Sequence, residues 1–319
     1  MGKEKKTMEL SLLLMKQILS MALMILMGFT VVRAGILKTE QSSVLSALVI
    51  YLIAPCTEIS AFQVEYNSDR LQGLVIATVA AAIAHLIFIT LSRIFGDLLK
   101  LSSVERASMI YSNGANLIIP LVSALLGEDM VFYTCAFIAV QNTCMWTHGV
   151  CLMNKREKPS VKKILLNPNM IAIIAGAIMF LARISLPPIV DTTVANVAAS
   201  LGAVCMFMIG MVMGGVNFKE AFSKLRLYGV CFGRLIAYPM IFILLISLSG
   251  ITRRIPEARQ VLMITTMAAC APVAVSVTQF ANLWGEGDDP KDAGSINVMS
   301  VLFCIVTMPF IIWIYQIIC

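Results

Sequence analysis

The segment "SNGANLIIP" (residues 112–120) places two amides, a glycine and a proline inside an otherwise apolar stretch. Proline lacks an amide hydrogen and clashes with the preceding helical turn, so Pro120 predicts an interrupted helix. Asn113 and Asn116 can donate and accept hydrogen bonds, and Gly114 permits a non-helical backbone path. These residue types therefore predict a broken helix that binds a small solute, because a membrane tolerates freed backbone groups only where protein or a water-filled cavity satisfies them.

A second interruption, "ACAP", ends at Pro272 in a later apolar stretch, and we expect Ala271 and Pro272 to form the partner break. Where two broken helices cross, the half-helix N-termini suit an anion and the freed carbonyl groups suit a cation. The alternative is that these prolines only kink ordinary membrane helices, as Pro55 and Pro239 are expected to do. The recurrence of the interruption in corresponding spans favours a paired break.

Three ionisable side chains inside apolar stretches are candidates for ion coupling, because charge is costly at membrane depth. His85 could carry a coupled proton, and the alternative is a neutral ring hydrogen-bonded inside the bundle. Glu58 is a candidate proton or cation ligand, or reaches interfacial water. Arg234 either attracts a carboxylate or extends to the cytoplasmic surface. Asn142 is predicted to line the substrate path, with helix packing as its alternative role.

Other chemistry has little support in the sequence. The nine cysteines never form C-x-x-C and are interpreted as packing residues, and two histidines do not suffice for a His-rich metal site. No phosphate loop, nucleotide-binding motif or nucleophile–base motif is present. We therefore expect no enzyme, no ATP-driven transport and no cofactor beyond a coupling proton or sodium ion. The net charge of +6 is attributed to loops beside a membrane and not to nucleic acid binding.

Membrane-spanning helices must position these residues. The chain is 59% hydrophobic and 13% charged, with a mean hydropathy of +0.88, whereas soluble proteins have roughly a quarter of their residues charged. Apolar runs of ~18 or more residues indicate transmembrane helices. We predict an all-α integral membrane protein with ten spans, at about 9–32, 42–62, 71–95, 104–126, 130–153, 168–186, 192–215, 227–250, 257–283 and 293–317.

The spans fall into two halves related by a constant shift. Glu105 and Pro120 correspond to Glu257 and Pro272, since 257 − 105 and 272 − 120 both give 152. Five spans per half is an odd number, so the halves would enter the membrane from opposite faces as a 5+5 inverted repeat. The fourth and ninth spans would be the crossed broken helices. The predicted organisation is a first repeat at 1–153, a cytoplasmic linker at 154–167 and a second repeat at 168–319.

The distribution of basic residues predicts the orientation. Loops on the side of the linker hold 14 lysines and arginines and the opposite loops hold 8, so the linker is predicted cytoplasmic and both termini extracytoplasmic. The basic N-terminus argues the other way. Gly210 and Gly214 form G-x-x-x-G, which indicates close helix packing inside the chain or, alternatively, a homodimer contact.

The chain resembles the auxin efflux carrier family, relatives of the plant PIN-formed auxin exporters. The resemblance rests on the order and spacing of "YLIAPCTEISAF", "NGANLIIP", "LLNPNMIAIIAGAIMFL", "LGAVCMFMIGMVMGG", "GRLIAYPMI", "APVAVSVTQFANLWG" and "INVMSVLFCIVTMPFII". The family pattern usually has glycine two residues before the first proline, where Ile118 stands here. The resemblance implies ten helices in an inverted repeat, divided into a scaffold and a transport domain with crossed broken helices. It implies organic anions as cargo, such as auxin, malate or malonate.

Together these features predict a secondary transporter of the plasma or inner membrane that moves a small organic anion by alternating access. Its predicted partners are that anion and the lipid bilayer. A cation/proton antiporter or cation-coupled symporter of related fold is the nearest alternative. An intramembrane enzyme or a membrane receptor would need a reactive dyad or a soluble output domain, and neither is recognisable in the sequence.

Overall fold

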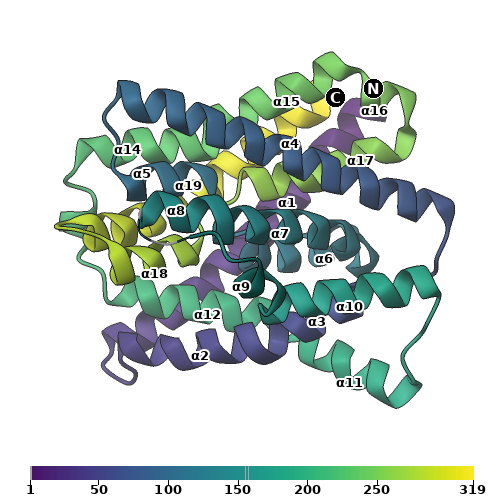
Figure 1. The fold of residues 1–319 in the computed structure, drawn as a ribbon, viewed down its shortest axis with the longest axis horizontal. Coiled ribbons are helices and arrows are strands. Elements are labelled where there is room, and N and C mark those ends of the chain that lie inside the picture. The colour runs from purple at the N-terminus through teal and green to yellow at the C-terminus, as the bar shows by residue number, and fades with distance from the viewer. Residues whose placement is uncertain (1, 155, 157) are drawn as a thin grey trace.

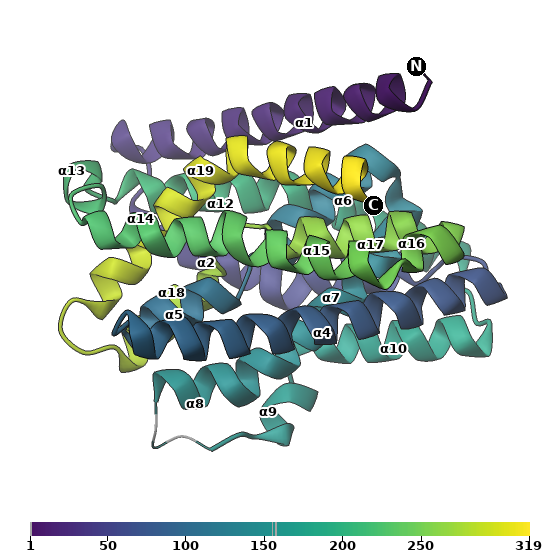
Figure 2. The same cartoon turned by 90° about the horizontal axis from the view of Figure 1, so that it is seen from above.

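The computed structural model describes residues 2–154, 156 and 158–319, and the side chains of these residues except 2–11 and 256. Helices make up 84% of the chain, and the described residues contain no strand beyond one isolated bridge. The long helices lie side by side, and the two ends of the chain lie at the same end of the bundle (Figures 1 and 2). Lys155, one of the basic residues of the predicted cytoplasmic linker, lies outside the described residues.

The helical segments of the first half of the chain have the following bounds. They are α1 (Gly2–Arg33), α2 (Ser42–Leu48), η2 (Val49–Ile53), α3 (Ala54–Ala61), α4 (Ser68–Leu98), α5 (Ser103–Ile110), η3 (Gly114–Ile118), α6 (Ile119–Leu126), α7 (Val131–Cys144) and α8 (Val150–Met153), with η5 (Met145–Gly149) joining the last two. Short 3₁₀ turns, η1 (Thr39–Gln41) and η4 (Glu128–Met130), precede α2 and α7.

The second half follows a short linker helix, α9 (Val161–Leu165). Its helices are α10 (Pro168–Ala182), α11 (Pro188–Ala199), α12 (Leu201–Gly214), α13 (Phe218–Ala221), α14 (Leu225–Phe232), η6 (Gly233–Ala237), α15 (Tyr238–Ser249), α16 (Ile251–Arg254), α17 (Pro256–Ala269), α18 (Val275–Trp284) and α19 (Asp289–Ile318).

Six helical segments of the described chain are long and apolar enough to cross a membrane, which is consistent with a multi-pass membrane protein. They are Leu12–Arg33, Thr39–Ala61, Ser68–Leu98, Pro188–Gly214, Leu225–Ser249 and Asp289–Ile318. The ten predicted spans are not confirmed by this count, because the interrupted helices fall into shorter pieces. Helix α10, with 15 residues, is roughly 22 Å long against a hydrocarbon core of about 30 Å. It ends at Ala182, short of the predicted boundary at 186.

Wide π-helical turns accommodate three of the prolines. The turns η2, η3 and η6 each end two residues before a proline, at Pro55, Pro120 and Pro239 respectively. A proline offers no amide hydrogen and its ring collides with the carbonyl group four residues earlier, and widening the preceding turn relieves that collision. These three prolines are therefore tolerated inside helical segments without interrupting them.

The helices pack as two groups, each drawn from both halves of the chain. One group, called the α1 group here, contains α1 to α3 and α10 to α12, and the other, the α4 group, contains α4 to α8 and α14 to α19. Within the α1 group, α1 and α12 approach closely at glycines: a Cβ at Gly210 would collide with the carbonyl oxygen of Ile25, and a Cβ at Gly214 would lie 2.8 Å from the Val32 side chain. The G-x-x-x-G spacing thus serves packing inside the chain, while a homodimer remains a prediction.

Candidate functional site

The breaks between α5 and η3 and between α17 and α18 lie against each other and are joined through their main chains. Asn113 N–H donates to the carbonyl of Pro272 at 2.7 Å, and Ala274 N–H donates to the carbonyl of Tyr111 at 3.0 Å. These bonds flank an antiparallel bridge between Ser112 and Val273. In that geometry the N–H and C=O groups of the two central residues point away from the partner segment, so they need other partners.

Side chains from α7 and α19 supply those partners. Gln141 accepts from the Ser112 amide at 3.0 Å and donates to the Ser112 carbonyl at 2.8 Å. On the other side, Ser300 accepts from the Val273 amide and Asn297 donates to the Val273 carbonyl, both at 3.1 Å. The unwound backbone is therefore satisfied by protein at membrane depth, as it must be where water is absent.

A cavity of about 100 Å³, the crossing cavity, lies at the start of the two second half-helices. Four of the predicted substrate residues line it: Asn113, Gly114, Asn116 and Asn142. The sequence interpretation missed six further polar lining residues: Ser46, Ser112, Gln141, Asn169, Ser276 and Gln279. Asn169 and Ser276 lie in the quoted stretches "LLNPNMI" and "APVAVSV", where a polar residue within an apolar run was the available signal.

The lining of the crossing cavity is polar and, among the described residues, uncharged. Asn113 is 5% exposed, and its side-chain Nδ2 has no hydrogen-bond partner within the described structure. The first turns of η3 and α18 contribute Gly114, Ala115, Val275 and Ser276 to the same cavity. Helix N-termini carry unsatisfied N–H groups and a partial positive charge, so the cavity offers donors without a formal charge.

The position of the first break differs from the prediction. The chain leaves the helix at Tyr111–Asn113, whereas Pro120 lies in α6 behind η3. The matched Glu-to-Pro spacing therefore does not mark the crossing: the Pro120–Pro272 match has a shift of 152, but Ser112 meets Val273, a difference of 273 − 112 = 161. Gly114 has no left-handed backbone conformation, so its predicted role in relaxing the backbone finds no counterpart in its dihedral angles.

Three predicted substrate residues do not line the crossing cavity. Pro120 lines a different cavity, near the other end of the bundle. Ala271 and Pro272 are in the second break, where their carbonyl groups accept hydrogen bonds from Arg234 and from the Asn113 amide. Ala271 and Pro272 thus contribute main-chain carbonyl groups that hold the crossing together.

The ion-coupling candidates lie apart from the cavity, and all three are buried. The His85 Nδ1 atom lies 2.8 Å from the Ala81 carbonyl, and Nε2 has no hydrogen-bond partner among the described residues. Both carboxyl oxygens of Glu58 also lack one there, and the side chain neighbours Cys135 of α7. Arg234 contacts backbone carbonyls of both breaks. Glu58 and Arg234 are both 0% exposed, so neither side chain extends to the surface of the bundle.

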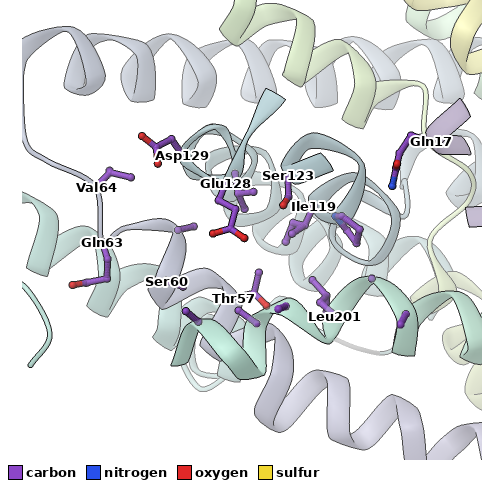
Figure 3. A pocket seen from close by; sticks show the side chains of 18 of the residues that line it. Gln17, Thr57, Ser60, Gln63, Val64, Ile119, Ser123, Glu128, Asp129 and Leu201 are labelled. Carbon is purple, nitrogen blue, oxygen red and sulfur yellow. The ribbon is translucent and has the colours of Figure 1, made fainter. Parts of the chain in front are cut away.

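Two larger cavities lie on either side of the crossing. A vestibule of about 540 Å³, lined by α2, α12, α18 and the start of α19, shares Ser46, Met208 and Gln279 with the crossing cavity. A second cavity of about 400 Å³, called the outer cavity after the predicted orientation, is drawn in Figure 3. Its lining residues include Thr57, Ser60, Ser123 and Glu128. Helix α6 meets α12 between them: a Cβ at Gly202 would lie 3.2 Å from Pro120 Cβ. The crossing cavity adjoins the vestibule, because Ser46, Met208 and Gln279 line both.

Comparison with known proteins gives one family match. A family model described as "Membrane transport protein" matches residues 13–312, which run from α1 into α19 and include both breaks. No individual curated protein matches the chain.

Proposed function

This chain belongs to the auxin efflux carrier family of membrane transport proteins, and from that premise we propose that it is a secondary active transporter of a small organic anion. The cargo would be a carboxylate such as malate, malonate or an auxin-like acid. It would bind in the crossing cavity and cross the membrane by alternating access. The family is one of transporters, so the proposal includes no enzymatic step.

The observation that carries the proposal is the unpartnered amide of Asn113. A donor that is 5% exposed and has no hydrogen-bond partner in the described structure is costly unless a ligand satisfies it. Two helix N-termini converge on the same cavity, and their dipoles favour an anion. Ligand pockets usually measure roughly 300–1,000 Å³, so a cavity of about 100 Å³ suits a carboxylate head group, with the rest of the molecule in the vestibule.

The two helix groups support a mechanism of alternating access. The crossing belongs to the α4 group, and its cavity is also lined by residues of α2, α10 and α12 of the α1 group. Movement of the α4 group along the α1 group would separate Pro120 from Gly202 and connect the crossing to the outer cavity. With the predicted orientation, the present arrangement opens toward the cytoplasm.

The proposal also covers how the chain spans the membrane and which energy source drives transport. We propose ten spans in a 5+5 inverted repeat, with both termini outside the plasma membrane and the 154–167 linker inside. Energy would come from the membrane potential, the substrate gradient or a coupling ion, with Glu58 and His85 as proton-carrying candidates.

A cation/proton antiporter is the second candidate function, and the buried, unpartnered carboxyl of Glu58 is the observation that favours it. Glu58 does not line the crossing cavity, whose described lining contains no carboxylate to bind a cation. An anion carrier therefore agrees better with the geometry.

Uptake by purified protein in liposomes tests the proposal. Radiolabelled malate, malonate and indole acetate would be offered under imposed proton and sodium gradients. We expect at least one of the acids to accumulate above empty liposomes, and Asn113→Leu to abolish that uptake while Ser123→Ala, in the outer cavity, retains it. If none of the acids moves, the proposed function is wrong.

A further inference from the structure

Arg234 is a fully buried arginine that contacts both breaks at once. It belongs to η6, in the eighth predicted span, and its side chain is 0% exposed. The Nε atom donates to the Ala271 carbonyl at 3.1 Å, and Nη1 lies 3.2 Å from the Ile110 carbonyl and 3.4 Å from the Met109 carbonyl. One guanidinium therefore joins the two unwound segments.

The carbonyl groups that Arg234 contacts lie at the C-terminal ends of two half-helices. Met109 and Ile110 are the last two residues of α5, and Ala271 lies two residues beyond the end of α17. Helix C-termini carry unsatisfied carbonyl groups and a partial negative charge. Two such ends meeting at membrane depth form a site that attracts a cation. In transporters with discontinuous helices, unwound carbonyls and half-helix C-termini coordinate the coupling ion.

The charge of Arg234 is balanced by these dipoles and not by a carboxylate. Arg234 takes part in no salt bridge within the described residues. Its guanidinium also lies 5.8 Å from the centroid of the Phe88 ring, a distance at which the ring face attracts a cation. The planar fork of an arginine can reach several carbonyl groups that a compact ammonium could not reach together.

We propose that Arg234 is a tethered cation that occupies the place where a crossing of this kind would otherwise bind a sodium ion. It is a positioning residue: by neutralising the two C-terminal ends it holds the crossing, and hence the two N-termini on the opposite side, in the geometry that binds the anion. The proposal rests on the proposed function for its transport consequence, which is that the crossing needs no sodium ion.

Thermal unfolding of the purified full-length chain tests this proposal without any transport. We expect the wild type to unfold at the same temperature in sodium chloride and in choline chloride. Arg234→Ala should unfold about 5 °C lower or more, and millimolar guanidinium should restore part of that loss because it refills the cationic site. Urea, which has a similar shape but no charge, should not restore it, and Arg93→Met on the exposed face of α4 is the matched control.

If Arg234→Ala does not fold, two further variants test the proposed role of Arg234. Arg234→Lys keeps the charge and Arg234→Met keeps only the length, so the lysine variant should be the more stable of the two. In liposomes, Arg234→Met should slow anion uptake about ten- to hundredfold through misplacement of the crossing. The proposal is overturned if Arg234→Met unfolds and transports like the wild type, or if the wild type requires sodium. A wild type that moves none of the acids refutes the proposed function alone, since the unfolding test remains valid.

Discussion

Individual buried polar groups in this protein divide into those that hold the backbone and those that are free for a ligand or a proton. Gln141, Asn297 and Ser300 are committed to the carbonyl and amide groups of the crossing. Asn113 and Glu58 retain atoms with no hydrogen-bond partner among the described residues. Mutation of the first set is expected to lower the stability of the fold, and mutation of the second set is expected to impair transport.

The neighbouring residues Gln141 and Asn142 provide a direct test of this division. Gln141→Leu would leave the amide and carbonyl of Ser112 unpaired, at roughly 1–3 kcal/mol for each buried group, so we expect a large loss of stability. Asn142→Leu changes a half-buried side chain at the cavity, and we expect weaker substrate binding with nearly unchanged stability. Thermal unfolding and uptake assays on both variants measure the two effects. Equal unfolding temperatures for the two variants would contradict the assignment.

Glu58→Gln tests whether this carboxyl carries a coupling proton. An ionised carboxylate without a partner is very costly at membrane depth, so we expect Glu58 to be protonated here. Glutamine is a neutral group of similar size, so the variant should fold as stably as the wild type but lose the dependence of transport on a proton gradient. Uptake at several imposed gradients gives the measurement, with Glu65→Gln on the exposed turn after α3 as control. If the dependence survives, His85→Gln in the same assay tests the remaining candidate.

The helical elements show two different responses to proline. Pro55, Pro120 and Pro239 follow widened turns within helical segments, whereas Pro272 lies in a segment that has left the helix altogether. The two cases differ in the hydrogen-bond partners of the backbone. The residues around Pro272 bond to the other break, whereas those just before Pro120 bond within their own helical segment. Sequence alone could not separate them, because each proline removes the same amide hydrogen.

The two prolines of the predicted breaks should therefore differ on mutation. Pro272→Ala would add a buried amide hydrogen within the crossing and permit α17 to continue, so we expect uptake to fall about tenfold or more. Pro120→Ala only removes the cause of a widened turn and should retain most of the uptake. Initial uptake rates at matched protein levels measure the difference. A greater loss from Pro120→Ala would show that η3, and not the crossing, controls the site.

The whole molecule consists of two helix groups with the binding geometry at their boundary. Many leucines and isoleucines on α1, α4 and α10 are exposed, as expected for surfaces that face lipid. The glycine contacts between α1 and α12 make the α1 group closely packed. The vestibule and the outer cavity lie on opposite sides of the contact between Pro120 and Gly202. A relative shift of the groups is therefore the simplest route from one cavity to the other.

Single cysteines in the two cavities test both the orientation and the shift. In sealed vesicles with the cell exterior outward, a membrane-impermeant maleimide should react with Ser123→Cys and not with Thr278→Cys, since these positions line the outer cavity and the vestibule respectively. The parent chain, with its own nine cysteines, sets the background. Transported anion should change the labelling rate at both positions. Labelling of Thr278→Cys from outside would reverse the predicted orientation.

Sequence alone determined that this is a helical membrane protein with interrupted helices, because hydropathy and the missing amide of proline act over a few neighbouring residues. It also predicted Asn113, Gly114, Asn116 and Asn142 as site residues, because amides and a glycine are conspicuous within apolar runs, and all four line the crossing cavity. Only the tertiary structure decided that Ser112 meets Val273, that Gln141 satisfies Ser112, and that Arg234 joins the half-helix ends. A freed backbone group can be satisfied by any side chain brought within hydrogen-bonding distance, and that choice depends on contacts between residues far apart in the chain.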